Sequence, residues 1–358
     1  MKHYNIPIFI PHLGCPFDCI YCNQKTIAAQ QYIPDARQVI NTIEQYLQTI
    51  PAQGFVEVAF FGGNFTAVDK QQQVDFLQAV QPFLQEGRVQ SIRVSTRPDC
   101  IDDSALDLLA HYGVRMIELG VQSLSDKVLQ ASAREYCAED VYKSSHLIKK
   151  WQFDLGIQLM IGLPQDSHTQ DLETTRQVIA LRPQVVRIYP TLVIAETALE
   201  DIWNRGEYSP LSLKDAVLIC RDMFMLFQRA DIRVIRMGLY PGEELCREGI
   251  VKAGPFHPGF GELVEQAVFK EQIRQAIKEY FDKSGYAARI NLRVNFRDVS
   301  KAVGRYRDNI HELTREFGLA ALDVKADPSL DRNSVGISVL GDQCLVISRS
   351  RFLEGAVV

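Results

Sequence analysis

The amino-acid sequence predicts an α/β fold: a partial TIM-like barrel of six or seven βα units, followed by a small C-terminal α/β domain. Short runs rich in β-branched and aromatic residues alternate along the chain with amphipathic stretches of helical length. Most of these runs are apolar throughout, which is typical of parallel strands that are covered on both faces. Six or seven units are too few for a closed barrel, which has eight.

Seven runs are expected to form the strands of the barrel. They comprise residues 6–10, 56–61, 91–95, 115–119, 156–161, 185–189 and 232–237. Apolar side chains recur at helical spacing between them, at residues 36–48, 70–84 and 102–111. Residues 1–240 are therefore expected to form the barrel.

The alternation of strands and helices stops near residue 240. Glycine and proline crowd the stretch that follows, and a strong helical pattern covers residues 261–282. We expect residues 241–284 to pack on the barrel and residues 285–358 to form the small domain. The elements expected in this domain are a strand at 290–296 that alternates Ile290, Leu292, Val294 and Phe296, a helix at 305–317, and strands at 319–324, 334–340 and 343–348.

Composition and charge exclude several classes of protein. The 358 residues include 39 basic and 44 acidic side chains, so the formal net charge is −5 and gives no overall basic field for nucleic acid. No apolar run reaches the roughly 20 residues that span a bilayer, and the N-terminal apolar run is too short for a signal peptide. We expect a cytoplasmic protein without a membrane partner.

The region after residue 284 is less acidic, with a net charge of +2. Basic side chains alternate with apolar ones there. They are Arg289, Arg293, Arg297, Lys301, Arg305 and Arg307. This pattern fits either a face that contacts RNA phosphates or an ordinary solvated face of a strand and helix.

Three of the eight cysteines form a cluster, Cys15, Cys19 and Cys22, directly after the first expected strand. Thiolates on one short loop can reach one metal centre. Three explanations are open: buried small side chains, a structural zinc site completed by His12 or His3, or a [4Fe-4S] cluster. Zinc usually takes a second ligand pair, which the sequence does not offer. An iron–sulfur cluster with three thiolates leaves one iron open to an outside ligand.

The C-x3-C-x2-C spacing, with aromatic Tyr21 before the third cysteine, resembles the signature of the radical S-adenosylmethionine (radical SAM) enzymes. The resemblance implies that Cys15, Cys19 and Cys22 hold a [4Fe-4S] cluster and that S-adenosylmethionine chelates the open iron. One electron, from a donor such as flavodoxin or ferredoxin, then cleaves the sulfonium to methionine and a 5′-deoxyadenosyl radical.

Residues at the ends of later strands extend this resemblance. Gly62, Gly63 and Asn64 follow the second strand, where the family holds the methionine amino group, although many members have Glu in place of Asn64. At the end of the third strand, Ser95 is a candidate ribose or methionine contact, and Arg97 a candidate cofactor or substrate contact. A tight turn and solvated polar side chains are the alternative explanations.

The fourth and fifth strands supply further candidates by resemblance. Gln122 matches a glutamine that binds the ribose hydroxyls, and Arg134 matches an arginine that pairs with the methionine carboxylate. The family usually has Arg-Gly-His where this chain has Arg134-Glu135-Tyr136. Met160 lies on the strand that flanks the adenine in family members.

Two segments, residues 188–197 and 254–263, closely resemble the radical domain of the Elongator catalytic subunit. The similarity covers roughly residues 4–284. The length predicts an Elongator-like chain without the acetyltransferase domain. The expected substrate is tRNA or another RNA. Radical chemistry on a small metabolite, and a non-catalytic zinc or iron–sulfur interaction or sensor protein, are the alternatives.

Overall fold

The computed structural model describes residues 2–10, 15, 19–23, 33–51, 53–339 and 345–356. The chain divides into two compact units. The barrel unit consists of Met1–Ser212 and Ile232–Phe256, and the small unit consists of Leu213–Asp231 and His257–Val358. In the part of the chain that is described, no helix has the length and apolar character needed to cross a membrane.

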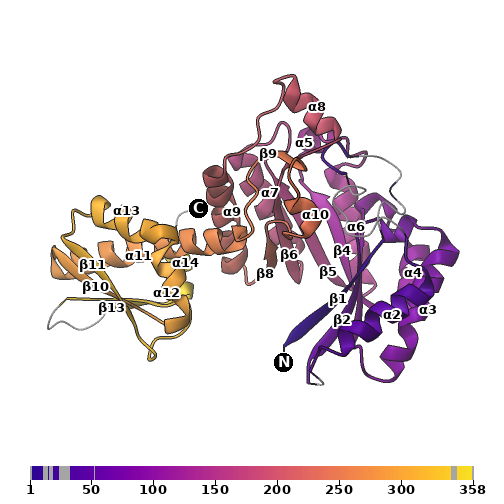
Figure 1. The fold of residues 1–358 in the computed structure, drawn as a ribbon, viewed down its shortest axis with the longest axis horizontal. Coiled ribbons are helices and arrows are strands. Elements are labelled where there is room, and N and C mark those ends of the chain that lie inside the picture. Colours follow the sequence, from indigo (N-terminus) through magenta and orange to yellow (C-terminus); the bar gives the residue numbers. More distant parts are fainter. Residues whose placement is uncertain are drawn as a thin grey trace. The chain divides into compact units, whose positions relative to one another are not determined.

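The barrel unit is built on a seven-stranded parallel sheet that curls into a half-barrel (Figure 1). Its strands, in spatial order, are β1 (His3–Phe9), β2 (Phe55–Phe61), β3 (Ser91–Thr96), β4 (Val114–Gln122), β5 (Asp154–Ile161), β6 (Val185–Pro190) and β8 (Arg233–Met237). Each expected run overlaps one of these strands, and the predicted partial barrel is confirmed.

Helices and short elements connect the strands. They are α2 (Ala36–Leu47), η1 (Phe65–Ala67), α3 (Lys70–Gln85), η2 (Pro98–Cys100), α4 (Asp103–His111), α5 (Asp126–Ala131), α6 (Ala138–Lys150), α7 (His168–Leu181), β7 (Val193–Ile194), α8 (Ala198–Asn204), α10 (Glu243–Cys246) and β9 (Val251–Ala253). Aspartates start three of the long helices: the side chains of Asp35, Asp69 and Asp102 accept hydrogen bonds from backbone N–H groups of the first turn. β7 and β9 pair antiparallel in a separate small sheet.

One face of the half-barrel carries a row of charges on strands β2, β3, β4 and β6: Glu57, Arg93 and Glu118, which are buried, and Arg187, which is half-buried. Arg93 lies between the two carboxylates, with Nη2 2.6 Å from Glu57 and Nη1 3.3 Å from Glu118. Arg187 adds a second cation 3.0 Å from Glu118. Two guanidinium groups thus balance two carboxylates in a setting where an unpaired charge is costly.

Strand β5 contributes a glycine to this row instead of a charge. Gly156 pairs with Glu118 in the sheet, and a Cβ atom at Gly156 would lie 3.2 Å from Cγ of Glu118. The missing side chain leaves the space through which Arg187 of β6 reaches Glu118. On the opposite face of β2, Val58 and Phe60 are fully buried in the apolar core.

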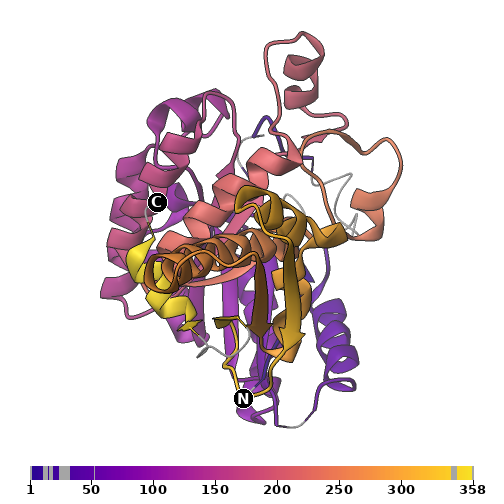
Figure 2. The same ribbon diagram turned by 90° about the vertical axis from the view of Figure 1, so that its left-hand side faces the viewer.

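The small unit combines a four-stranded mixed sheet, in the order β11-β10-β12-β13, with helices on one of its faces (Figures 1 and 2). Its elements are α9 (Leu213–Arg229), α11 (Phe260–Ser284), β10 (Arg289–Val294), η3 (Phe296–Asp298), α12 (Val299–Val303), η4 (Arg305–Arg307), α13 (Asp308–Glu316), β11 (Ala321–Ala326), β12 (Val335–Ser338), β13 (Leu345–Ile347) and α14 (Arg349–Gly355). The long helix α11 packs against α9, α12, α13 and the strands β12 and β13.

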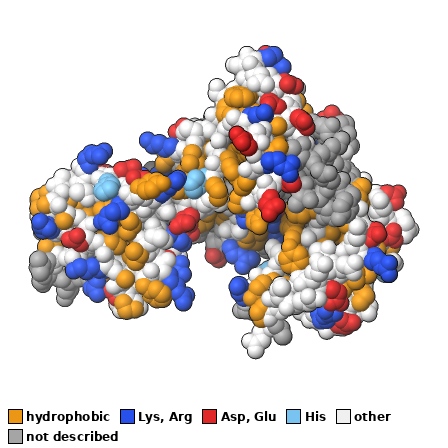
Figure 3. Space-filling view, in the orientation of Figure 1, with side chains coloured by type: hydrophobic (Ala, Val, Ile, Leu, Met, Phe, Trp, Pro, Cys, Tyr) orange, Lys and Arg blue, Asp and Glu red, His pale blue; other side chains and the backbone are white. Residues whose placement is uncertain are grey.

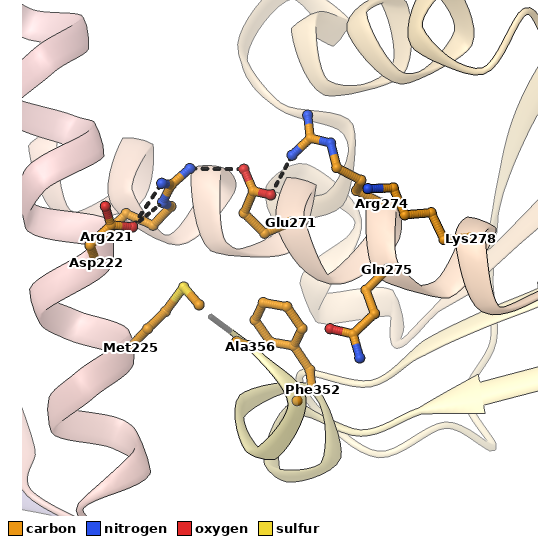
Figure 4. A pocket seen from close by; sticks show the side chains of 10 residues that line it. Arg221, Asp222, Met225, Glu271, Arg274, Gln275, Lys278, Phe352 and Ala356 are labelled. Atoms are coloured by element: carbon orange, nitrogen blue, oxygen red, sulfur yellow. Dashed lines mark hydrogen bonds and ion pairs between the residues drawn. The ribbon is translucent and has the colours of Figure 1, made fainter. Parts of the chain in front are cut away.

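Helices α9, α11 and α14 enclose an open hollow of about 320 Å³ within the small unit (Figure 4). Arg221 on α9 pairs with its neighbour Asp222 and, at 2.8 Å, with Glu271 on α11. Arg274 also contacts Glu271. The charges that line this hollow therefore hold α9 and α11 to each other.

The sequence pattern is wrong about the end of β10. Phe296 was expected to continue the alternation of Ile290, Leu292 and Val294, but the strand stops at Val294 and Phe296 is exposed. Asn295 ends the strand because its side chain accepts a hydrogen bond from the backbone N–H of Arg297, which turns the chain into η3.

Replacing Arg93 with methionine is expected to lower the free energy of unfolding by about 3–5 kcal/mol, because Glu57 and Glu118 would stay buried without their shared cation. Urea denaturation followed by circular dichroism measures the loss. The matched control is Arg115→Met, which removes an ion pair to Asp154 whose arginine side chain is 65% exposed. Equal effects of the two substitutions would contradict the importance of the charged row.

Candidate functional site

The carboxyl ends of parallel strands meet at one edge of the sheet, and the turn after β2 lies at this edge. Gly62 has a φ of +92°, and a Cβ atom there would lie 3.1 Å from the Phe9 ring, so the turn requires glycine. The side chain of Asn64 is fully buried. Its Nδ2 donates to Sγ of Cys100 at 3.0 Å, and its Oδ1 accepts from the backbone N–H of Arg97 at 3.1 Å. Asn64 thereby fastens the Gly62-Gly63 turn to the end of β3.

Two hydroxyl groups near this edge are buried without a hydrogen-bond partner among the described residues. They are Oγ of Ser95 on β3 and the phenol of Tyr21 in the cysteine loop. Buried hydroxyls in proteins nearly always have a partner, so such groups indicate a place where a ligand or water completes the bonding. Burial also raises the pKa of Tyr21, which keeps its phenol protonated and able to donate.

Strand β4 ends in an irregular turn that positions Gln122. Its pairing with β5 shifts register between Gly120 and Gln122, and Gln122 has a φ of +64°. The amide of Gln158 on β5 donates to Oε1 of Gln122 at 3.4 Å. A Cβ atom at Gly120 would lie 3.1 Å from Nε2 of Gln122 and 3.6 Å from Nη2 of Arg134. The small residue therefore lets both predicted cofactor contacts pack against the strand end.

Arg134 connects the end of β4 to the cysteine loop. Its guanidinium is almost fully buried; Nη2 donates to the carbonyl oxygen of Gly120, Nε to the phenol of Tyr136 at 3.0 Å, and Nη1 to Sγ of Cys19 at 3.0 Å. The Tyr136 phenol in turn donates to backbone carbonyls of β4. Tyr136 stands where the family motif has histidine, and the sequence pattern did not identify it as part of the site.

The described part of the cysteine loop is tied to the chain segment that follows β6. The backbone N–H of Leu199 donates to the carbonyl oxygen of Ile20 at 2.8 Å, and the amide of Asn23 donates to the carbonyl oxygen of Ala195 at 2.9 Å. Ile20 and Tyr21 also pack on an apolar cluster formed by Val193, Leu199 and Tyr208. The Elongator-like segment 188–197 thus supports the loop that carries Cys19 and Cys22.

The cysteines at the site are free thiols. Cys19 is buried, and Cys15 and Cys22 are half-buried; burial, with Cys19 nearby, raises the pKa of Cys15. A fourth thiol, Cys100, contacts Asn64, and burial raises the pKa of this thiol as well. Cys100 was not singled out from the sequence, because it lies far from the cluster along the chain.

The donor set fits an iron–sulfur cluster in its chemistry: three free thiols on one loop, with a guanidinium next to one of them. Within the described ranges, no three His, Cys, Asp or Glu side chains are gathered closely enough to hold a metal ion. Ligation by Cys15, Cys19 and Cys22 therefore stays a prediction.

The remaining candidates fall into three groups. Met160 is half-buried on β5, two residues from Gln158 on the same face of the strand. Arg97 is buried and forms an ion pair with Asp99 at 2.8 Å. His12, a possible zinc ligand, lies outside the described residues.

Two carboxyl groups are buried together beyond the end of β5. Burial raises the pKa of Asp171, on the first turn of α7, and the neighbouring carboxyl of Asp166 raises it further. Each of the two side chains has a buried oxygen without a partner among the described residues. Asp166 also lines a hollow of about 230 Å³, next to Tyr208, whose phenol donates to the carbonyl oxygen of Gly162 at 2.7 Å.

Comparisons with known proteins agree with this architecture. A family model described as "Radical SAM superfamily" matches residues 9–178, and a "Radical_SAM C-terminal domain" model matches residues 183–270. The structure of an N-terminally truncated Elp3 from Methanocaldococcus infernus superimposes with a TM-score of 0.61 and 21% identity, covering 80% of this chain and 68% of that chain. The similarity to this Elp3 structure supports the fold.

The relatives found by sequence match a smaller share of this chain than the Elp3 structure does. The tRNA uridine(34) acetyltransferase of Dehalococcoides mccartyi is 26% identical over 239 residues, which is 57% of this chain and 52% of the relative. Elongator complex protein 3 of Homo sapiens is 29% identical over 202 residues, or 50% and 37% of the two chains. The chain therefore spans about half or less of the length of these two relatives.

A parallel half-barrel with a cysteine loop and polar residues at the ends of its strands is typical of the partial-barrel enzymes that use S-adenosylmethionine. The two family models together match most of the sequence, and the chain belongs to the radical SAM superfamily. Among the proteins of this superfamily it is similar to those of the Elongator type.

The Asp166–Asp171 pair predicts a pH dependence of stability. Because the folded state raises the pKa of Asp171 above 3.8, its stabilising contribution is complete below that pH and is lost as pH rises through the folded pKa. We expect Asp171→Asn to gain stability relative to the native chain as pH rises from about 4 to 8. Urea midpoints across this range measure the difference. Asp107→Asn, at an exposed position, serves as the control. If the difference in stability between Asp171→Asn and the native chain does not change with pH, the prediction is wrong.

Proposed function

We propose that this enzyme holds a [4Fe-4S] cluster on Cys15, Cys19 and Cys22, cleaves S-adenosylmethionine reductively, and directs the resulting radical at tRNA or another RNA. The observation that carries the proposal is the hydrogen bond from the buried guanidinium of Arg134 to Sγ of Cys19. It joins the cysteine loop to the strand end where the cofactor contacts of the family are expected.

A [4Fe-4S] cluster held by Cys15, Cys19 and Cys22, and reduced by a donor such as flavodoxin or ferredoxin, would supply the electron for the reductive cleavage of S-adenosylmethionine. The protein contributes binding and orientation. Arg134 carries the positive charge for the methionine carboxylate, and Tyr136 fixes its guanidinium through two hydrogen bonds. Because Tyr136 is itself bonded to the backbone of β4, the arginine cannot turn away without breaking buried contacts.

Other residues are assigned to the rest of the cofactor. The Gly62-Gly63 turn exposes backbone groups to the methionine amino group, since glycine allows close approach. The hydroxyl of Ser95 and the amide of Gln122 are the candidate ribose contacts, and Met160 is the candidate adenine contact. In this assignment Asn64 makes no direct contact with the cofactor. Its amide acts indirectly, by fixing the turn to β3.

An RNA substrate is supported by what the relatives are named for. The curated relatives include tRNA uridine(34) acetyltransferases and Elongator complex protein 3. Since the chain covers about half or less of these proteins, their complete reaction is not transferred to it. A small metabolite is the competing substrate class. If the substrate is a small metabolite, added RNA should change neither the rate of 5′-deoxyadenosine formation nor the products of the reaction.

Cys19→Ala is expected to lose most of the bound iron and to abolish 5′-deoxyadenosine formation, because two thiolates cannot hold the cluster. Anaerobic reconstitution, iron analysis and an assay with dithionite and S-adenosylmethionine measure both properties. Cys246→Ala, which removes an exposed thiol, is the neutral control. Cys100→Ala tests the thiol next to Asn64 and is expected to keep its iron.

Two results would overturn parts of this proposal. A Cys19→Ala protein with full iron content would refute the ligand assignment, and loss of iron in Cys100→Ala would point to a fourth thiolate and a closed cluster. The substrate is tested separately by adding unfractionated tRNA to the assay. An increase in 5′-deoxyadenosine formation, with a modified nucleoside in the recovered tRNA, supports RNA as the substrate.

A further inference from the structure

Two aromatic rings stand exposed at the two ends of α12 in the small unit. Phe296 in η3 is 57% exposed, and Tyr306 in η4 is 76% exposed. Each ring is accompanied by a guanidinium: that of Arg297 lies 5.3 Å from the centre of the Phe296 ring, and that of Arg305 lies 4.9 Å from the centre of the Tyr306 ring. Each ring therefore offers an exposed aromatic surface and a positive charge to the same ligand.

The backbone around Tyr306 is held in an unfavourable conformation. Tyr306 and Arg307 are consecutive non-glycine residues with φ of +51° and +64°. Gly304 before them has a φ of +77°, and a Cβ atom there would lie 2.9 Å from Cγ of Asn309. The buried Asn309 donates from Nδ2 to the backbone oxygens of Gln266 and Lys301. Strain that is enforced by a buried residue is typical of functional positions.

Arg305 is fixed as well. Its backbone N–H donates to Oε1 of Gln266 at 3.0 Å, and its Nη1 lies 3.0 Å from Nε2 of His257. The other ring nitrogen of His257 accepts from the backbone N–H of Gly259. The guanidinium next to Tyr306 is therefore held by its contact with His257.

The second ring has a similar support. Asn295 donates to the backbone oxygen of Leu330 at 2.8 Å, and the fully buried Asp298 accepts from Arg332 and from the backbone N–H of Asn333. Both ends of α12 are therefore rigid and present an aromatic ring to solvent.

The local charge is positive. Residues 289–315 contain seven basic and three acidic side chains. Of the acidic ones, Asp298 is buried against Arg332, and Glu312 pairs with Lys270 at 2.6 Å. On the face shown in Figure 3, Lys and Arg side chains are interspersed with hydrophobic and some acidic ones over the part of the small unit that Figure 1 labels β10, β11 and α13.

We propose that Phe296, Arg297 and the Arg305-Tyr306-Arg307 turn bind single-stranded RNA. Exposed bases would stack on the two rings, and the guanidinium groups would contact the phosphates. In a duplex the bases are already stacked on one another, so this surface selects single-stranded segments. The two rings are separate and each lies beside a charge, which favours a nucleic acid over a protein or membrane partner that needs a continuous apolar patch.

This inference rests on the proposed RNA substrate and adds a place of contact outside the barrel unit. Its test uses the full chain and a fluorescent 12-nucleotide single-stranded RNA, with the same RNA annealed to its complement as the duplex probe. Binding is measured by fluorescence anisotropy without cluster reduction. Its outcome is therefore independent of whether the enzyme cleaves S-adenosylmethionine.

The double variant Phe296→Ala/Tyr306→Ala is expected to bind the single strand about tenfold or more weakly, because it loses two stacking surfaces. Arg305→Gln and Arg307→Gln are each expected to reduce the slope of log affinity against log salt by about 0.7. Tyr286→Ala is the matched control: Tyr286 is 62% exposed and precedes β10, whereas Phe296 follows that strand. It should bind like the native chain.

The proposal is overturned if the native chain binds the duplex as well as the single strand. It is also overturned if the double variant binds RNA as tightly as Tyr286→Ala. Formation of 5′-deoxyadenosine without RNA, measured in the same variants, should stay at the native rate. A variant that loses RNA binding but keeps this rate separates the contact surface from the cofactor chemistry, as the proposal requires.

Discussion

The fold of the barrel unit depends on the ion pairs that Arg93 makes with Glu57 and Glu118 in the interior of the half-barrel. A buried arginine between two carboxylates tolerates little movement, because any separation leaves a charge without a partner. These ion pairs therefore link three neighbouring parallel strands, β2, β3 and β4. Their carboxyl ends carry the Gly62 turn, Ser95 and Gln122, so the same constraint that stabilises the sheet also aligns the candidate cofactor contacts.

Arg134 extends this alignment from the sheet to the cysteine loop. The arginine is bonded to Gly120 and Tyr136 on one side and to Cys19 on the other. The segment after β6 holds the same loop through the backbone bond between Leu199 and Ile20. The loop is thus attached to both the middle and the far part of the sheet. A cluster bound to this loop would lie close to the carboxyl ends of the strands, where the candidate cofactor contacts are. Radical chemistry on a bound cofactor requires the cluster and the cofactor to be close to each other.

Local patterns predicted the strands of the barrel well, because apolar periodicity depends on residues that are close together in the sequence. The partners of the site could not be predicted in this way. Tyr136 binds Arg134 only because both fold against the end of β4, and Cys100 meets Asn64 from 36 residues away. Phe296 continued an apolar alternation, yet the side-chain bond of Asn295 turned it outward. In each case a tertiary or side-chain contact that has no periodicity decided the outcome.

The distribution of charge indicates that the barrel unit and the small unit bind different ligands. In the barrel interior, the guanidinium groups of Arg93 and Arg187 are neutralised by Glu57 and Glu118. This row therefore has little charge left to attract a polyanion. In the small unit, the guanidinium groups of Arg297 and Arg305 lie beside exposed rings, and the turn at Tyr306 and Arg307 has positive φ angles. Under the two proposals, a charged, single-stranded substrate would be recognised outside the barrel, while the three thiols and Arg134 would bind the cofactor within it.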